Sequence, residues 1–183
     1  MSGIILEPSA SGAGNVSIVA PVVGSPIDVL LPSVTTSISH VLATAVLPAV
    51  GTTVTYAVSG LANRIVISLK DVSLNGSQRV TLRLSSGGAQ VTAGYDGASD
   101  AIAHSDAFIF SGADGAHQRV GPIILDHMGN NVWSMISVIQ LTGSTLGYSA
   151  GWVQLPGPID GIALSNNGAN TFDLGSFYVK VEV

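Results

Sequence analysis

Apolar and polar side chains alternate with a period of two along several short stretches of this chain. In the run 79–84, RVTLRL, every second residue is apolar, and the same period continues unbroken from Phe177 to Val183. Successive side chains of a strand point to opposite faces, so each run predicts a strand with one buried and one solvated face. The two arginines of the first run are expected on the outer face, because burying them unpaired would be costly.

Turn residues separate these runs at short intervals. The pairs Gly87-Gly88 and Asn75-Gly76 permit the backbone angles that tight turns need. Pro122 predicts an edge strand or a bulge within its run. Strands are predicted near 54–58, 64–72, 80–84, 107–111, 119–126, 132–141, 159–165 and 175–183. About eight short strands with turns between them predict an all-β, jelly-roll-like antiparallel β-sandwich, although an immunoglobulin-like sandwich fits the same pattern.

The sequence does not decide the secondary structure of two segments. The run 35–50 has the composition of either a short helix or a strand, and periodicity does not settle so short an apolar run. The run 143–151 is predicted as a loop or a short edge strand. Within 132–141, Trp133, Met135 and Ser137 are predicted to share one face. Trp133 is interpreted as a core residue, and Trp152 either as a core residue or as a loop aromatic that stacks on sugar rings.

Few residues of this chain carry charge. Charged residues make up 9% of the sequence, against about 25% in ordinary soluble domains, while apolar residues make up 46%. This combination excludes ordinary disorder. A surface with so little charge suggests that partner subunits cover much of it, because an isolated monomer gains solubility from charge.

Several function classes are excluded or disfavoured by composition. The net charge is −5, and six scattered Lys and Arg supply no basic stripe for nucleic acid. Cysteine is absent, which excludes disulfides, thiolate metal sites and a cysteine nucleophile. No apolar run reaches the ~20 residues that span a bilayer, and no secretory signal is evident. We therefore expect no nucleic-acid partner, no membrane insertion and no cofactor.

Residues 1–50 are interpreted as an extended N-terminal arm, and residues 51–183 as the β-sandwich domain. The arm holds two short alternating segments, 15–20 and 26–31, each followed by proline, which favours strand edges and ends. Two such segments do not bury their own apolar faces, so they are expected to lie on another surface. The candidate contact residues are Val16, Ile18, Ile27, Val29 and Leu31.

A series of motifs from about Val54 to Val183 resembles the C-terminal β-sandwich domain of many bacteriophage tail fibres and related virion proteins. The motifs are the strand at 78–84 with Gly87-Gly88 and Gly94-Tyr95, the aromatic run 108–110, the strand 121–126 followed by Trp133-Ser134, LPGPIDGIALS at 155–165 and TFDLGSFYVKV at 171–181. The last is the most specific. The chain departs from the family in having no long shaft, and in carrying Ser85-Ser86 where the family has a glycine before Gly-Gly.

The resemblance implies a non-enzymatic structural protein of a phage virion, of tail-fibre or receptor-binding type. It implies a homotrimer on the particle surface, in the tail or the head, that contacts other virion proteins through the arm and a host glycan or protein through its loops. The receptor-facing candidates are Tyr95, Asp96, Asp100, His104, Asp114, His117 and Tyr148. The aromatic ones, with Trp152, could stack on sugar rings.

Two other functions are compatible with the sequence. A single short domain with an arm suits a capsid decoration or cement protein that clamps neighbouring head proteins by strand addition. A small glycan hydrolase is the third, although no pair of carboxylates is singled out as glycoside hydrolysis requires. The polar segment from Asp96 to Asp106 lacks the spacing of an EF-hand, and we expect no metal there.

Overall fold

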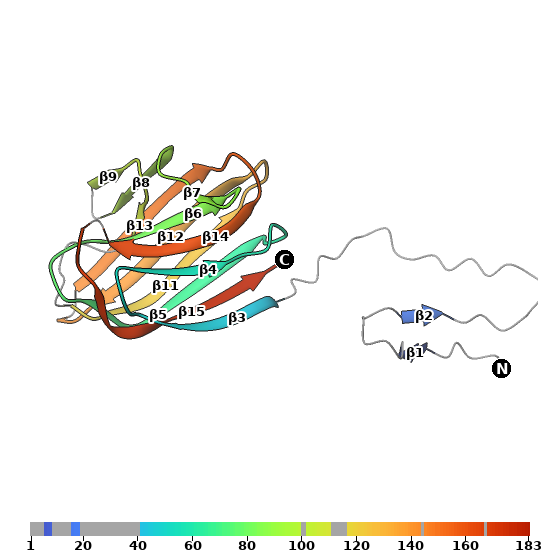
Figure 1. Cartoon of the computed structure of the whole chain (residues 1–183), viewed down its shortest axis with the longest axis horizontal. Helices are drawn as coiled ribbons and strands as arrows, with labels where there is room; N and C mark the ends of the chain where they lie inside the picture. The colour runs from blue at the N-terminus through green and yellow to red at the C-terminus, as the bar shows by residue number, and fades with distance from the viewer. Residues whose placement is uncertain are drawn as a thin grey trace, which may run out of the picture. The chain divides into compact units, whose positions relative to one another are not determined.

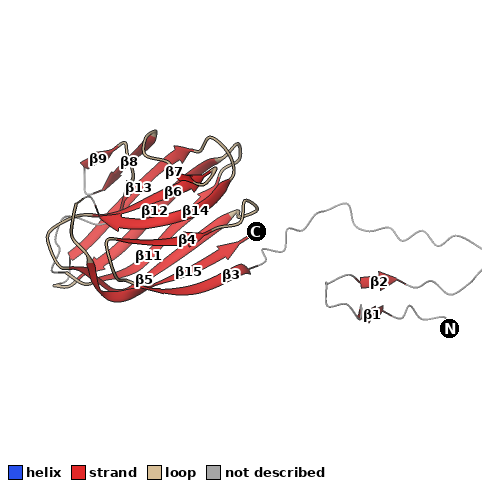
Figure 2. Cartoon of the chain, viewed as in Figure 1, coloured by secondary structure: helices blue, strands red, loops and turns tan. Residues whose placement is uncertain are grey.

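The computed structural model describes residues 6–8, 16–18, 41–99, 102–110, 117–143, 145–166 and 168–183. Among these residues, strands are the only regular elements. Figure 2 shows these strands in red with tan loops between them. The chain divides into two units, Met1–Thr36 and Ser37–Val183. In the first unit β1 (Leu6–Pro8) pairs antiparallel with β2 (Val16–Ile18). The second unit is an antiparallel β-sandwich.

The larger sheet of the sandwich has eight strands, in the order β3-β15-β5-β11-β12-β13-β8-β9. Every neighbouring pair in this order is antiparallel. The strands are β3 (Val41–Pro48), β5 (Arg64–Leu74), β8 (Tyr95–Ser99), β9 (Ile102–His104), β11 (Arg119–His127), β12 (Val132–Leu141), β13 (Thr145–Gln154) and β15 (Phe172–Glu182).

The smaller sheet has the order β10-β6-β14-β4, and the short β7 pairs with β6. Its strands are β4 (Thr53–Ala57), β6 (Val80–Ser86), β7 (Ala89–Gln90), β10 (Phe108–Ile109) and β14 (Ile159–Asn166). From β3 to β6 the chain changes sheet at every step. In Figure 1, β14 and β4 pass in front of β11 and β12, so the two sheets are seen as stacked layers.

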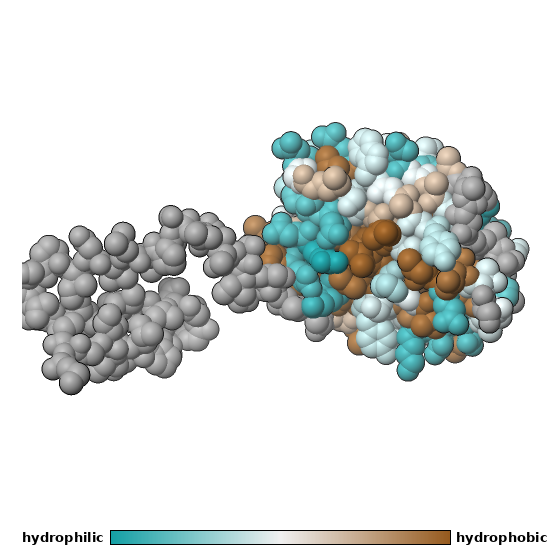
Figure 3. Space-filling view, turned by 180° about the vertical axis from the view of Figure 1, so that it is seen from behind, coloured by the Kyte–Doolittle hydropathy of each residue, from teal (hydrophilic) through white to brown (hydrophobic). Residues whose placement is uncertain are grey.

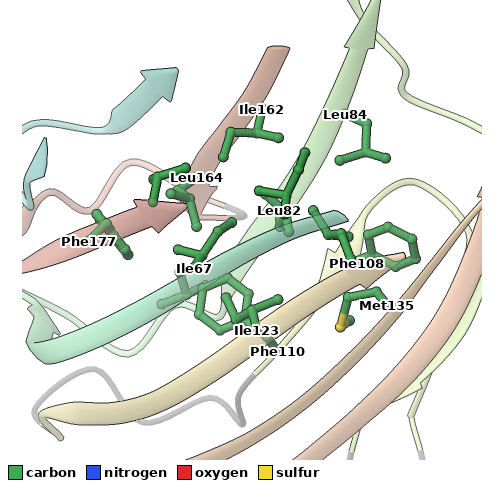
Figure 4. Packing of buried hydrophobic residues seen from close by; sticks show 14 of the residues in the cluster. Ile67, Leu82, Leu84, Phe108, Phe110, Ile123, Met135, Ile162, Leu164 and Phe177 are labelled. Atoms are coloured by element: carbon green, nitrogen blue, oxygen red, sulfur yellow. The ribbon is translucent and has the colours of Figure 1, made fainter. Parts of the chain in front are cut away.

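A single apolar core fills the space between the sheets. Figure 4 shows leucine and isoleucine side chains of β6 and β14 pointing toward side chains of the larger sheet. Each fully buried side chain of this size contributes about 1.5–3 kcal/mol, so the core dominates the stability of the unit. The labelled core residues are Ile67, Leu82, Leu84, Phe108, Phe110, Ile123, Met135, Ile162, Leu164 and Phe177, all buried.

Glycine and asparagine residues form turns between neighbouring strands of the structure. Gly87 and Gly88, at φ +65° and +78°, form the turn between β6 and β7. Asn130 and Asn131 both have positive φ in the turn between β11 and β12. Pro122 predicts an edge strand or a bulge. β11 is not an edge strand, because β5 and β12 pair with it on both sides, but its register against β5 shifts just before Pro122, between Arg119 and Gly121.

The structure settles the segments that the sequence left open. The run 35–50 contains strand β3, which pairs with β15 in the larger sheet. The sequence interpretation starts the β-sandwich domain at residue 51, but the sheet already includes residues 41–48. The run 143–151 belongs mostly to β13, a ten-residue strand that pairs with both β12 and β8. Trp133, Met135 and Ser137 share the buried face of β12, as predicted.

Candidate binding surfaces

Tyr95 does not face a receptor, which corrects the sequence prediction. It is the first residue of β8 and is only 4% exposed. Its ring packs edge to face on Phe108 at 4.8 Å, and its hydroxyl oxygen accepts a hydrogen bond of 2.9 Å from the Leu84 N–H. The tyrosine therefore joins β8 of the larger sheet to β6 across the core.

Burial raises the pKa of Tyr95 to about 12, because the phenolate would lose its hydration. The Leu84 hydrogen bond and the positive charge of Arg83 oppose this effect only in part. The folded chain therefore keeps the phenol proton to higher pH than the unfolded chain does. The stability that this provides is complete below pH ~10 and is lost as the pH rises toward ~12.

The ionisation of tyrosine can be followed by absorbance as the pH is raised, in the wild type and in a Tyr95→Phe variant. We expect the difference between the two titration curves to show one phenol that ionises near pH 12. The phenylalanine variant leaves the buried Leu84 N–H without its acceptor, so its free energy of unfolding at pH 7 should fall by about 1–3 kcal/mol. This deficit should shrink between pH 10 and 12, since only the wild type loses stability there. A difference step near pH 10 would contradict the buried position.

The other receptor-facing candidates are scattered over the sandwich. Asp96 is exposed on β8, and His104, on β9, and His117 are half-buried. Tyr148 is 56% exposed, but it lies on the strand β13 and not in a loop. Asp100 and Asp114 lie outside the described residues.

A polar cluster joins the end of β9 to the smaller sheet. Arg83 donates from Nη2 to the Asp106 carboxylate at 2.9 Å and from Nε to the Asp106 carbonyl at 3.0 Å. Nearby, burial and the positive charge of Arg79 lower the pKa of His104, while Asp106 opposes this. The imidazole is therefore biased toward its neutral form. The prediction that Arg83 lies on the outer face with a partner is confirmed.

No candidate metal site is found in the part of the chain that the structure describes. No group of three or more His, Cys, Asp or Glu could hold a metal ion there. In the same residues no helix is long and apolar enough to cross a membrane. Buried atoms without a hydrogen-bond partner in the described part include Ser99 Oγ and His104 Nε2, which lie on paired strands.

The outer face of the larger sheet has an apolar centre. Its strands present large exposed side chains, and Figure 3, seen from behind the view of Figure 1, shows apolar residues in brown gathered in the middle of the molecule. The exposed large residues of this face are Val46, Val120, Ile136, Val138, Leu146, Tyr148, Trp152 and Tyr178, each at least 41% exposed. We call this surface the apolar face.

Two shallow hollows mark the apolar face, and a half-exposed tyrosine stands at each. One hollow, of about 300 Å³, is lined by residues of β3, β5 and β15 that include Val46, Val66, Tyr178 and the charged Lys180. The other, of about 370 Å³, is lined by residues of β8, β12 and β13 that include Ile136 and Tyr148. Both linings are mostly apolar.

Charged groups lie at the border of the apolar face. Arg64 pairs with Asp126 at 3.4 Å, and Lys180 pairs with Glu182 at 2.6 Å. These strand positions follow one end of the sheet, because Arg64 lies opposite both Glu182 and Asp126 in the register. Lys180 also lines the hollow beside Val66 and Tyr178, and Asp96, opposite Trp152, is a further exposed charge of this face.

The outer face of the smaller sheet has a different chemistry. Ser165 lies opposite Thr81 on one side and Thr53 on the other, and its Oγ is 2.9 Å from Thr81 Oγ1. Ala163 lies between Arg83 and Thr55 in the next row. Small and hydroxyl-bearing residues therefore line this side of β6 and β14, where Thr81, Ala163 and Ser165 are all buried.

The arm candidates lie outside this sandwich unit. Val16 and Ile18 belong to β2, where they are the register partners of Pro8 and Leu6. Ile27, Val29 and Leu31 lie outside the described residues. Their contact role stays a prediction from sequence.

Comparison of the chain with protein-family models, with curated proteins and with solved structures gave no match.

Sequence reasoning missed the apolar face. Trp152 is 44% exposed on it, so of the two interpretations of this residue the core position is wrong. The signal was present in 132–141, where apolar residues occupy both sets of alternating positions. Such a strand is apolar on both faces, which indicates that each face contacts something.

Proposed function

We propose that this chain is a non-enzymatic structural protein of a bacteriophage virion, of the tail-fibre or receptor-binding type. The observation that carries this proposal is the apolar face, since a large contiguous apolar surface indicates a protein that works in contact with another. In this role the arm docks to the particle, and loops at the rim of the sandwich meet the host surface.

The jelly-roll form of the sandwich is part of this proposal. A jelly roll is a long hairpin wrapped into two sheets, so strands pair from the ends of the hairpin inward. The pairs β3 with β15, β4 with β14, β5 with β11 and β6 with β10 follow this rule. The strands β12, β13, β8 and β9 then extend the larger sheet beyond β11.

The polar rim supports a docking role for the loops. Asp96 and Asp106 are exposed, and the Arg83 guanidinium is fixed by its two bonds to Asp106. Carboxylates and a held guanidinium can bind the hydroxyls of a surface glycan or the polar groups of a protein. A receptor of either kind suits this rim.

A capsid decoration protein is the second candidate, and the strand β3 favours it. Among the described strands β3 pairs only with β15, and its eight residues, VLATAVLP, include no charge. Natural proteins usually protect a long edge with charges, bulges or a short strand. An unprotected edge accepts a strand from a neighbouring protein, which is the bonding mode of a clamp.

Antibody labelling of the particles separates these functions. With a gold-labelled antibody against the purified chain, we expect label on the tail, and purified protein should lower the adsorption of particles to host cells. Label confined to the head, with particles that become heat-sensitive when the protein is lost, would favour decoration. Absence of label from the particle, or turnover of a host glycan by the purified protein, would overturn the proposal.

A further inference from the structure

We propose that Asn75 is a site of spontaneous covalent modification, at which the side-chain amide is lost as ammonia and a carboxylate takes its place. Asn75 and Gly76 lie in the turn between β5 and β6, and they are the one Asn-Gly pair among the described residues. The reaction consumes only water, and it is independent of the proposed function.

The reaction begins when the backbone nitrogen of Gly76 attacks Cγ of Asn75. The new N–Cγ bond closes a five-membered succinimide ring, the Cγ–Nδ2 bond breaks, and ammonia leaves with the proton that the Gly76 nitrogen gives up. Water then opens the ring at one of its two carbonyl carbons. Opening at Cγ gives aspartate, whereas opening at the main-chain carbonyl gives isoaspartate, whose main chain runs through Cβ and Cγ.

The Gly76 nitrogen is accessible for this attack. Asn75 is exposed and Gly76 is half-buried, and glycine has no Cβ that could shield its nitrogen. The next two N–H groups of the turn, those of Ser77 and Gln78, donate to the Asn170 side-chain oxygen at 3.2 and 3.3 Å. Within the described part of the chain the Gly76 N–H has no such acceptor, so its nitrogen is free to react.

A backbone donor holds and polarises the attacked amide. Asn75 Oδ1 accepts a hydrogen bond of 3.0 Å from the Thr171 N–H, and the Asn75 N–H donates to the Thr171 carbonyl, also at 3.0 Å. When the Gly76 nitrogen adds to Cγ, negative charge develops on Oδ1. The Thr171 N–H already points at that oxygen, so it stabilises the developing charge as the donors of an oxyanion hole do.

The packing of the turn requires the glycine that makes Asn75 reactive. A Cβ at residue 76 would lie 2.7 Å from Cγ of Asn170. Moving the Asn170 amide away would break its bonds to the Ser77 and Gln78 N–H groups. A larger residue, which would slow the attack, is therefore disfavoured at this position.

Other exposed asparagines lack this combination of features. Asn63 is exposed, but Arg64 follows it, and Asn130 is exposed, but Asn131 follows it. A side chain on the following residue crowds the nitrogen that must attack. We therefore expect Asn75 to react well before Asn63 or Asn130.

Peptide-mapping mass spectrometry of the full chain, incubated for several days near neutral pH, tests this modification. The peptide that contains Asn75 is expected to gain about 1 Da, the difference between an amide and a carboxyl group. The attack requires loss of the Gly76 amide proton, so the rate should rise about tenfold for each unit of pH. The peptides with Asn63 and Asn130 are controls within the same sample, and they should keep their mass.

An Asn75→Gln variant should not gain the mass, because its longer side chain would have to close a six-membered ring. If this variant does not fold, the wild type in urea gives a second measurement, since the unfolded chain reacts at the rate of a free peptide. A turn that protected Asn75 would react only through unfolding, about a thousandfold or more slowly. We expect the folded chain to react within about tenfold of the unfolded rate, a barrier difference of about 1.4 kcal/mol at most. A larger slowing, or equal modification of Asn63, would overturn the proposal.

Discussion

Trp133→Ala is expected to lower the free energy of unfolding by about 3–5 kcal/mol, while Trp152→Ala changes it by less than about 1 kcal/mol. The chain has two tryptophans, which lie on neighbouring strands and differ in exposure. Trp133 is 1% exposed in the core and stacks on His127 at 5.1 Å, whereas Trp152 is 44% exposed. Removing the buried indole leaves a cavity that rigid neighbouring strands do not fill.

Urea denaturation followed by far-ultraviolet circular dichroism measures both variants, because tryptophan fluorescence would change with the substitution itself. Two protein concentrations are needed, since association raises apparent stability by mass action. Equal losses from the two variants, at both concentrations, would mean that the structure has assigned the wrong tryptophan to the core.

Gly175→Ala is expected to cost roughly 3 kcal/mol or more, and to lower the melting temperature by about 6 °C or more. Gly175 lies where the register of β15 against β5 shifts, at φ +94°. A Cβ there would lie 2.5 Å from the Lys70 carbonyl oxygen and 2.6 Å from the Asp71 carbonyl carbon. These contacts are with backbone, so no side-chain rotation relieves them.

A Gly51→Ala variant separates the two contributions to the lost stability, which are the steric clash of the new Cβ and the unfavourable left-handed backbone conformation. Gly51 has a similar φ of +77°, but a Cβ there meets no heavy atom within 4 Å. Its substitution should therefore cost only the left-handed conformation, about 1–2 kcal/mol. Thermal unfolding of both variants gives the comparison, and a Gly175→Ala variant no less stable than Gly51→Ala would contradict the backbone contact at the bulge.

Local pattern was sufficient for much of the fold. The alternation of 79–84 and 177–183 predicted strands that the structure confirms as parts of β6 and β15. The Gly87-Gly88 turn is also confirmed, because it depends on the backbone angles that these two residues allow. Short-range signals of this kind need no knowledge of the partner strand.

The candidate site was predicted less well. Gly94-Tyr95 has the composition of a loop, yet Tyr95 points inward because its hydroxyl meets the Leu84 N–H across the sandwich. The run 143–151, rich in glycine and serine, is a strand because β12 and β8 pair with it on both sides. In both places long-range pairing outweighs local propensity.

The sequence by itself determined that this chain folds from short strands joined by glycine and asparagine turns, with a core of alternating apolar residues and little charge. Only the tertiary structure decided which apolar residues lie outside. Tyr178, Ser68, Pro122 and Tyr148 are far apart in the chain, and strand order and register alone place them in one row. The two-residue period assigns a side chain to one of two faces, but which face is covered depends on where the other sheet lies.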